Sequence, residues 1–145
     1  MQISGLLVTI LLVIAGLLGT GQLQHNRMLT DAEVVAVAGN MLVYRNAVSA
    51  YADSHPGFAG AVADSALGLP TWFSKKPGLA NYLVAGRCYV FLPEVLPGLV
   101  GTLAKKSESI NVGINVGGVL QSPTSAVTGI PLPAQVPLAA VVIIQ

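Results

Sequence analysis

The sequence predicts an α+β protein with a single N-terminal transmembrane helix, a second amphipathic helix and then a small, mostly antiparallel β domain. Three observations predict this class. The chain opens with an uncharged apolar run, an apolar stripe with helical spacing follows, and short runs rich in β-branched and aromatic residues fill the second half. We expect two parts, a transmembrane anchor over residues 1–24 and an α+β domain over residues 25–145.

The composition excludes two large classes of protein. Charged residues make up 9% of the 145 residues and hydrophobic ones 53%, against about 25% charged in an ordinary soluble domain. So much apolar material excludes intrinsic disorder. A net charge of +1 supplies no clustered basic face, so no nucleic acid is expected as a partner. The composition favours a membrane-associated or secreted protein, or a subunit buried in an assembly.

The first element is the uncharged run from Ile3 to Gly21. As a helix, about 19 residues span about 28 Å, which matches the hydrocarbon core of a bilayer. A cleaved signal peptide is the competing interpretation, but the run is longer than a signal-peptide core and no Lys or Arg precedes it. We expect an uncleaved anchor, whose apolar side chains include Ile3, Leu7, Ile10, Leu11, Ile14, Leu17 and Leu18.

The anchor carries little information about its orientation. Arg27 and Arg45 follow it and no Lys or Arg precedes it, which weakly favours an outside N-terminus. Ala15 and Gly19 give the anchor a small-residue face through which it could self-associate.

An amphipathic helix is predicted next. Thr30 and Glu33 have the spacing of a capping box, and His55-Pro56-Gly57 should end the helix. The stripe on one face either packs on the protein's own sheet or binds a partner, and the sequence leaves both open. Its members are Val34, Val37, Met41, Tyr44, Val48 and Tyr51.

No catalytic, cofactor or metal site is expected. Asp53, Ser54 and His55 are adjacent in the chain, so their side chains cannot converge as a hydrolase triad. The single cysteine, Cys88, excludes an intramolecular disulfide and a Cys-rich zinc site. We expect Cys88 to be a buried apolar residue, with an intermolecular disulfide as the alternative.

The middle of the chain predicts a hairpin and a short helix. Two β-rich runs flank Gly86-Arg87, which favours a type II′ turn. We expect Trp72 and Phe73 to cover one face of this hairpin, with an exposed Trp72 as the alternative. A helix should follow Pro97 and end at Lys105-Lys106.

The uncharged tail predicts further strands. Residues 110–116 should form a half-buried strand whose apolar side chains share one face, leaving Gly113 and Gly117 on the other face, open to another backbone. The edge of this sheet must be covered by the proline-rich segment 130–133 or by a partner. The terminal run 139–144 should be a strand buried on both faces.

Several segments together resemble the PilM family of conjugative plasmids, which are small inner-membrane proteins of the type IV thin-pilus system. These segments are AGNMLVYRNAVSAYADSHPG, GLPTWF, AGRCYVFLP, GGVLQSP and TGIPLPAQVPLAAVVII. The resemblance implies a non-enzymatic component of pilus biogenesis that supports conjugation, in the basal body or in pilin transport. It also implies a cytoplasmic N-terminus, a periplasmic domain, no cofactor, and other pilus-assembly membrane proteins as partners.

Two other functions compete with this one. A minor-pilin-like subunit of the filament would share the plan of a hydrophobic helix followed by an α+β domain, but the basic leader and early glutamate of prepilins are absent. A periplasmic hydrolase would need a nucleophile and base, and no such arrangement is recognisable. For a partner interface the candidates, chosen by residue type, are Tyr44, Arg45, Tyr51 and Trp72.

Overall fold

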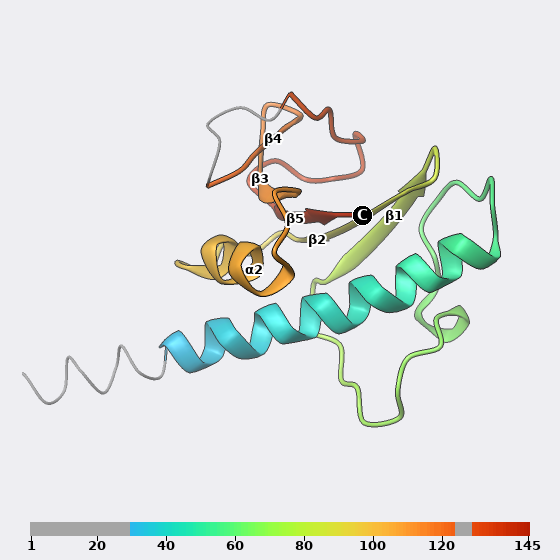
Figure 1. The fold of residues 1–145 in the computed structure, drawn as a ribbon, viewed down its shortest axis with the longest axis horizontal. Coiled ribbons are helices and arrows are strands. Elements are labelled where there is room, and N and C mark those ends of the chain that lie inside the picture. Colours follow the sequence, from blue (N-terminus) through green and yellow to red (C-terminus); the bar gives the residue numbers. More distant parts are fainter. Residues whose placement is uncertain (1–29, 124–128) are drawn as a thin grey trace, which may run out of the picture. The chain divides into compact units, whose positions relative to one another are not determined.

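The computed structural model describes residues 30–123 and 129–145. The chain divides into two compact units, Met1–Glu33 and Val34–Gln145, and the fold described here is that of the second. Residues 30–54 are helical and are called the long helix. The further elements are η1 (Asp64–Ala66), β1 (Ala80–Val84), β2 (Arg87–Leu92), α2 (Leu99–Ser107), β3 (Val112–Val116), β4 (Val119–Gln121) and β5 (Val141–Ile144) (Figure 1).

The described residues confirm the α+β class but do not reach the predicted anchor. Over residues 30–123 and 129–145, no helix is both long enough and apolar enough to cross a bilayer. The run from Ile3 to Gly21 lies outside the described residues, so the anchor and the boundary at residue 24 remain predictions. Thr30 is helical and is the first residue that the structure describes, so the predicted capping box of Thr30 and Glu33 stays a prediction.

The sheet is antiparallel throughout, with the strand order β1-β2-β5-β3-β4. The last strand in the sequence is therefore the central strand. All four residues of β5 are buried, which confirms the predicted strand buried on both faces. Alternate side chains of β5 point to opposite faces, so this strand contributes to two cores.

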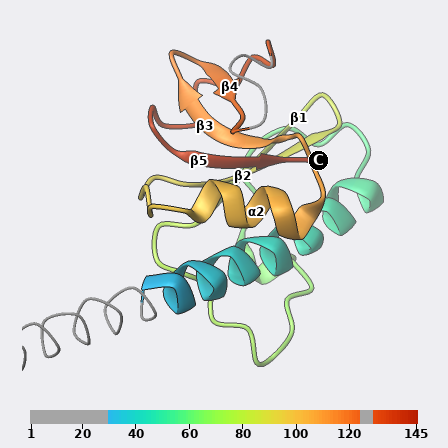
Figure 2. The same cartoon turned by 60° about the vertical axis from the view of Figure 1, so that its left-hand side comes forward.

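One face of the sheet packs against the long helix and α2 (Figures 1 and 2). The helical stripe is confirmed as core, except that Tyr51 is only half-buried. Leu99 and Leu103 of α2 are fully buried on the same face, as their spacing predicts. The sheet residues buried on this side are Leu83, Cys88, Val90, Leu92, Val112, Val141 and Ile143.

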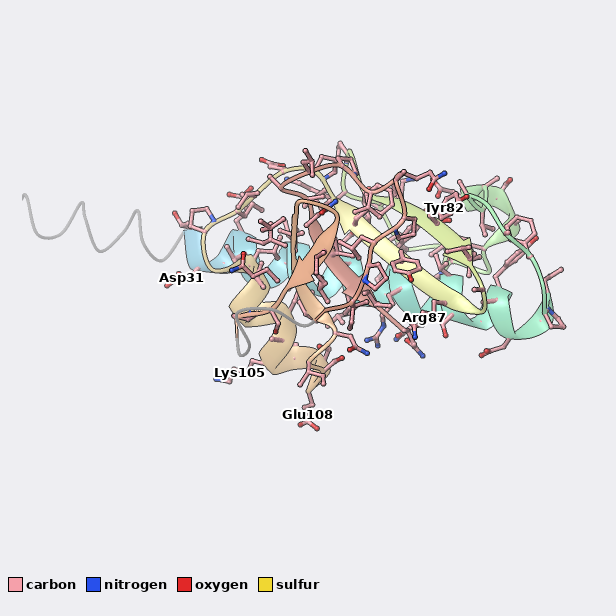
Figure 3. All side chains as sticks on the ribbon, turned by 90° about the horizontal axis from the view of Figure 1, so that it is seen from above. Asp31, Tyr82, Arg87, Lys105 and Glu108 are labelled. Atoms are coloured by element: carbon pink, nitrogen blue, oxygen red, sulfur yellow. The ribbon has the colours of Figure 1, made fainter. Side chains whose placement is uncertain are left out.

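The other face of the sheet is covered by the uncharged tail. Tyr89, Phe91, Val142 and Ile144 are buried there, together with Leu120 of β4. Val136 and Ala140 cover them, and Ile130 and Leu132 pack against them. The tail therefore serves as the second layer of the core. The charged side chains of Lys105 and Glu108 point outward from α2 and its end (Figure 3).

The predicted hairpin is present, but its turn differs from the prediction. Val84 pairs with Arg87, so Ala85 and Gly86 form the two-residue turn. Both have positive φ, +50° and +73°, which is the geometry of a type I′ turn. Such a turn matches the twist of the flanking strands, and Ala85 accepts a left-handed backbone for it.

Strand β3 covers Val112–Val116, so it begins two residues later than predicted, and Ile110, which was expected on its buried face, is 73% exposed. The burial within the strand also differs from the prediction. Val112 is fully buried, whereas Val116 is 54% exposed. Val116 lies beyond Ile114, the last residue of β3 that pairs with β5.

On the opposite face of β3, Asn115 is buried, and its amide donates to the carbonyl oxygens of Val136 and Pro137 at 2.9 and 3.1 Å. Its Oδ1 accepts from Gly118 N at 2.9 Å. These bonds satisfy a buried polar side chain and hold the tail against the sheet.

The predicted cover of the sheet edge is confirmed. Leu120 N donates to Ile130 O at 3.0 Å, and Leu132 N donates to Gly118 O at 2.8 Å. The proline-rich segment therefore pairs with β4. The close backbone approach predicted at the glycine side also occurs. A Cβ built on Gly113 would lie 2.2 Å from Gln121 O.

We expect Gly113→Ala to destabilise the protein strongly, by about 2 kcal/mol or more, because the added methyl meets backbone and forces β3 and β4 apart. The measurement is urea denaturation of the full chain followed by circular dichroism. Gly101→Ala is the matched control, because nothing lies within 4 Å of its added methyl. Since Gly101 is in α2, that change should leave stability equal or higher. Equal stability of the two variants would contradict this packing.

Candidate interaction surface

Residues 58–79 connect the long helix to β1, and we call them the strap. In Figure 1 the strap runs back along the long helix. It is joined to the edge of the sheet at Gly60, which exchanges two backbone hydrogen bonds with Leu83 of 2.8 and 2.9 Å. The strap has only a single turn of 3-10 helix, so side chains must fix its path.

The hydroxyl of Tyr44 joins three parts of the fold. Tyr44 lies on the long helix and is 1% exposed. Its hydroxyl donates to Asp64 Oδ1 on the strap at 2.6 Å and accepts from Asn81 Nδ2 on β1 at 2.7 Å. Helix, strap and sheet therefore meet at one buried oxygen atom.

Two asparagines extend this attachment in both directions. Asn81 Nδ2 donates to Val62 O at 2.9 Å, and its Oδ1 accepts from Val62 N at 2.8 Å. Asn40, on the long helix, donates to Ser74 O at 2.6 Å and accepts from Lys76 N at 2.9 Å. Each amide side chain thus pairs with strap backbone as a neighbouring strand would.

Lys75 and Phe73 cover the Tyr44 ring. The Lys75 ammonium pairs with the Asp64 carboxylate and lies 5.3 Å from the centre of the Tyr44 ring, a cation–π distance. The Phe73 ring stacks on Tyr44 with the centroids 6.3 Å apart. This part of the strap is therefore held by polar and apolar contacts together.

The environment fixes the protonation of these groups. Burial, followed by the hydrogen bond to Asp64, raises the pKa of Tyr44 well above its ordinary value, so its hydroxyl stays protonated. Burial alone would raise the pKa of Asp64, but the bonds to Lys75 and Tyr44 and the charge of Lys75 lower it. Burial raises the pKa of Cys88 to about 12, which keeps its thiol protonated and unreactive.

The strap presents Trp72 to solvent. Trp72 is 73% exposed, whereas Phe73 next to it is half-buried. The prediction that both rings cover the hairpin is wrong, because Phe73 stacks on the long helix instead. Trp72 is exposed, as the alternative prediction had it. Its role as an interface anchor stays a prediction.

Two hollows flank the crossing of the strap and the long helix. The first has a volume of about 240 Å³ and is lined by Ala36, Val37 and Asn40 of the helix and by residues 74–77 of the strap. The second, of about 250 Å³, is lined by residues that include Ala50, Tyr51 and His55. Both are smaller than sites that enclose a drug-sized ligand, and each has room for a side chain.

The four interface candidates do not form one surface. Tyr44 is buried inside the domain, so its side chain cannot be part of a surface that a partner contacts. Arg45 is half-buried, and its guanidinium donates to Asn46 Oδ1 at 2.8 and 3.2 Å. Burial raises the pKa of the Cys88 thiol on β2, and the positive charge of Arg45 opposes that rise. Tyr51 lines the second hollow and stacks on His55, with the centroids 4.0 Å apart. Trp72 projects from the strap.

Sequence reasoning missed Asn40, Asp64, Lys75 and Asn81. Their hydrogen-bond partners lie 19 to 37 residues away in the sequence, and Lys75 and Asp64 pair with each other across the strap, so no local pattern reveals these contacts. Asn81 alone gives a signal, because asparagine is disfavoured in strands. Across the part of the chain that the structure describes, no three His, Cys, Asp or Glu side chains gather where they could hold a metal ion.

Comparison with known proteins places this fold in a family. The sequence model of the PilM family matches residues 9–144. A crystal structure assigned as PilM from Pseudomonas aeruginosa 2192 is 38% identical, covers 78% of this chain and 95% of its own, and has a TM-score of 0.52. Another, assigned as PilM from Escherichia coli B7A, is 26% identical, covers 79% and 93%, and has a TM-score of 0.61. No curated protein matches the chain.

We expect Tyr44→Phe to lower the free energy of unfolding by about 1–3 kcal/mol, because Asn81 keeps a buried N–H whose acceptor is gone. Urea denaturation of the full chain measures this. Tyr51→Phe is the matched control, since it removes a hydroxyl from a half-buried ring on the same helix. Similar losses of unfolding free energy in both variants would show that the hydrogen bonds of the Tyr44 hydroxyl do not stabilise the fold more than a half-buried hydroxyl does.

The Asp64 contact should make stability depend on pH. Because the pKa of Asp64 is lower in the folded state than its ordinary 3.8, its contribution is present above that value. It is lost as the pH falls through the lower folded-state pKa. Between about pH 5 and pH 2, wild type should therefore lose more stability than Asp64→Asn. Asp53→Asn, at an exposed position of the long helix, is the control and should follow wild type. If Asp64→Asn lost as much stability as wild type over this range, the contact would contribute nothing.

Proposed function

Because this chain belongs to the PilM family, we propose that it is a non-enzymatic component of type IV pilus biogenesis at the bacterial inner membrane. It acts by binding other pilus-assembly membrane proteins, in the basal body or in pilin transport, and so supports conjugation. The family match over residues 9–144 is the observation that carries this proposal.

The fold supports a binding role. Both faces of the sheet are covered within the chain, and the proline-rich segment pairs with β4. The domain therefore has a complete core and does not need a partner to bury its sheet. The aromatic side chain it leaves most exposed, Trp72, is of a type that contributes strongly to protein interfaces.

In this proposal the N-terminal run anchors the protein as a single transmembrane helix, and the α+β domain lies in the periplasm. The run from Ile3 to Gly21 is uncharged and of bilayer length. The strap with Trp72 then faces partners in the periplasm. Neither a cofactor nor a metal takes part.

A minor-pilin-like subunit is the second candidate. One observation favours it, namely a long helix that packs against an antiparallel sheet, as the pilin plan requires. The two candidates differ in where the protein ends up. A biogenesis component stays in the membrane fraction, whereas a filament subunit appears in sheared pili.

The test is deletion of the gene in a piliated strain, followed by complementation with tagged variants. We expect the deletion to abolish surface pili in electron micrographs and wild type to restore them. Trp72→Ala should reduce piliation and lower the assembly proteins crosslinked to it by about tenfold, as expected for a hot-spot residue. Ile110→Ala is the matched control, since Ile110 is also 73% exposed but lies outside the strap, two residues before β3.

Normal pili in the deletion strain would overturn the proposal. Recovery of the tagged protein in sheared filaments, with major pilin as its only crosslinked partner, would favour the minor-pilin candidate instead. Equal loss of partners in Trp72→Ala and Ile110→Ala would remove Trp72 from the interface.

A further inference from the structure

Three strands meet at one end of the sheet, and the chain beyond each of them exposes an apolar side chain there. Leu92 at the end of β2 pairs with Val141 at the start of β5, and Ile114 of β3 pairs with the same residue. The residues that follow Leu92 and Ile114 therefore lie at the same end of the sheet as those that precede Val141. The large hydrophobic side chains exposed in these three stretches are Val95 (48%), Val116 (54%) and Leu138 (71%).

Val116 and Leu138 come from two segments that are bonded to each other. Asn115 N donates to Ala140 O at 3.0 Å, and Ala139 N donates to Asn115 O at 2.9 Å. These bonds fix the backbone on both sides of the contact. The exposure of the two apolar side chains is therefore built into the fold at this end of the sheet.

The long helix enters the domain at the same end. Ala36 of the helix lines the first hollow together with Lys76, and Lys76 Nζ lies 3.7 Å from Glu94 Oε2 in the loop that follows β2. Figures 1 and 2 both show the first turns of the helix at the same end of the domain as this loop. Val35, next to Ala36, is 47% exposed.

Most of the large hydrophobic side chains that the domain exposes are gathered here. In the described part of the chain seven such side chains are exposed, and four of them lie at this end. We call these four residues the apolar end: Val35, Val95, Val116 and Leu138.

The charges near the apolar end offset each other. Glu94 lies in the loop after β2, and the ammonium of Lys76 is close to its carboxylate. Other charged side chains lie toward the opposite end of the sheet, because Arg87 begins β2 and α2 leads from the apolar end to the start of β3. A surface that is apolar and without net charge suits insertion into a lipid interface better than contact with a strongly charged partner.

The chain that precedes Val34 brings this end close to a membrane. The run from Ile3 to Gly21 is uncharged and of bilayer length, and in the proposed function it is a transmembrane helix. Residues 22–33 connect this run to Val34, and even when fully extended they span at most about 43 Å. The end at which the long helix enters has the shortest tether, so the bilayer surface reaches it more readily than any other part of the domain.

We infer that the apolar end docks on the lipid surface, with its exposed side chains inserted at the boundary between headgroups and acyl chains. Binding of this kind grows with the apolar area that is buried. A tethered domain needs little such area, because the tether supplies a high effective concentration of lipid. The inference rests on the proposed function for the transmembrane anchor, and it deepens that proposal by naming the end of the domain that faces the membrane.

The test is quenching of a single tryptophan by lipid. The full chain with Trp72→Phe is reconstituted in phosphatidylcholine–phosphatidylglycerol vesicles, part of whose phosphatidylcholine carries bromine on the upper acyl chain. One variant adds Leu138→Trp and its matched control adds Ile110→Trp. The two positions are 71% and 73% exposed and lie at opposite ends of the sheet. We expect brominated lipid to lower the fluorescence of Leu138→Trp about twofold and to leave that of Ile110→Trp unchanged.

A second pair of variants tests whether the apolar side chains cause the docking. Here Val95→Trp reports from another segment of the apolar end. Adding Leu138→Asp should weaken its quenching at least about twofold, because a carboxylate is costly to bury in lipid. Adding Ile110→Asp should leave the quenching unchanged. Circular dichroism of each variant verifies its folding.

Equal quenching of Leu138→Trp and Ile110→Trp, or none at either position, would overturn the inference. Undiminished quenching of Val95→Trp in the presence of Leu138→Asp would also contradict it. Extraction of the vesicles with alkaline carbonate distinguishes this failure from that of the proposed function. A chain that stays with the vesicles but is not quenched removes only the inference, whereas a chain that carbonate extracts removes the proposed anchor as well.

Discussion

The buried hydroxyl of Tyr44 is the interaction on which the outer surface of this domain depends. It donates to the strap through Asp64 and accepts from the sheet through Asn81, while its ring lies under Phe73 and Lys75. A long connection without regular structure is costly to order, and an apolar residue at position 44 could not direct it. One oxygen therefore links a core position of the helix to the position of Trp72 at the surface.

Asparagines repeat this solution elsewhere. Asn40 and Asn81 pair with strap backbone, and Asn115 pairs with the backbone of the tail. Each offers a donor and an acceptor at once, so it satisfies irregular backbone that has no strand beside it. Only 9% of the residues in this chain are charged. Hydrogen bonds from neutral amide side chains therefore hold the strap and the tail in place, a role that ion pairs can fill in more highly charged proteins. This explains how a long uncharged tail can form the second layer of the core.

Periodicity predicted the regular elements from the sequence, because helices and strands are set by local spacing. The stripe from Val34 to Val48, the short helix after Pro97, the buried last strand and the open side of Gly113 followed from it. Periodicity could not predict the path of the strap, since that path is fixed by contacts between residues far apart in the chain. It could not predict the strand order either, because the insertion of β5 between β2 and β3 is decided by packing on both faces of the sheet. At residues 115 and 116, alternation predicted the wrong burial, because the tail covers Asn115 on one face and Val116 on the other face lies beyond the part of β3 that pairs with β5.

The most direct test of this account uses Trp72, the only tryptophan of the chain. Time-resolved fluorescence anisotropy of the full chain reports whether its ring moves with the domain or independently of it. If the Tyr44 hydroxyl fixes the strap, wild type and Tyr51→Phe should show mainly the slow decay of the whole particle, and Tyr44→Phe should gain a fast component. The same decay in Tyr44→Phe as in wild type would contradict the claim that this hydroxyl positions the exposed surface.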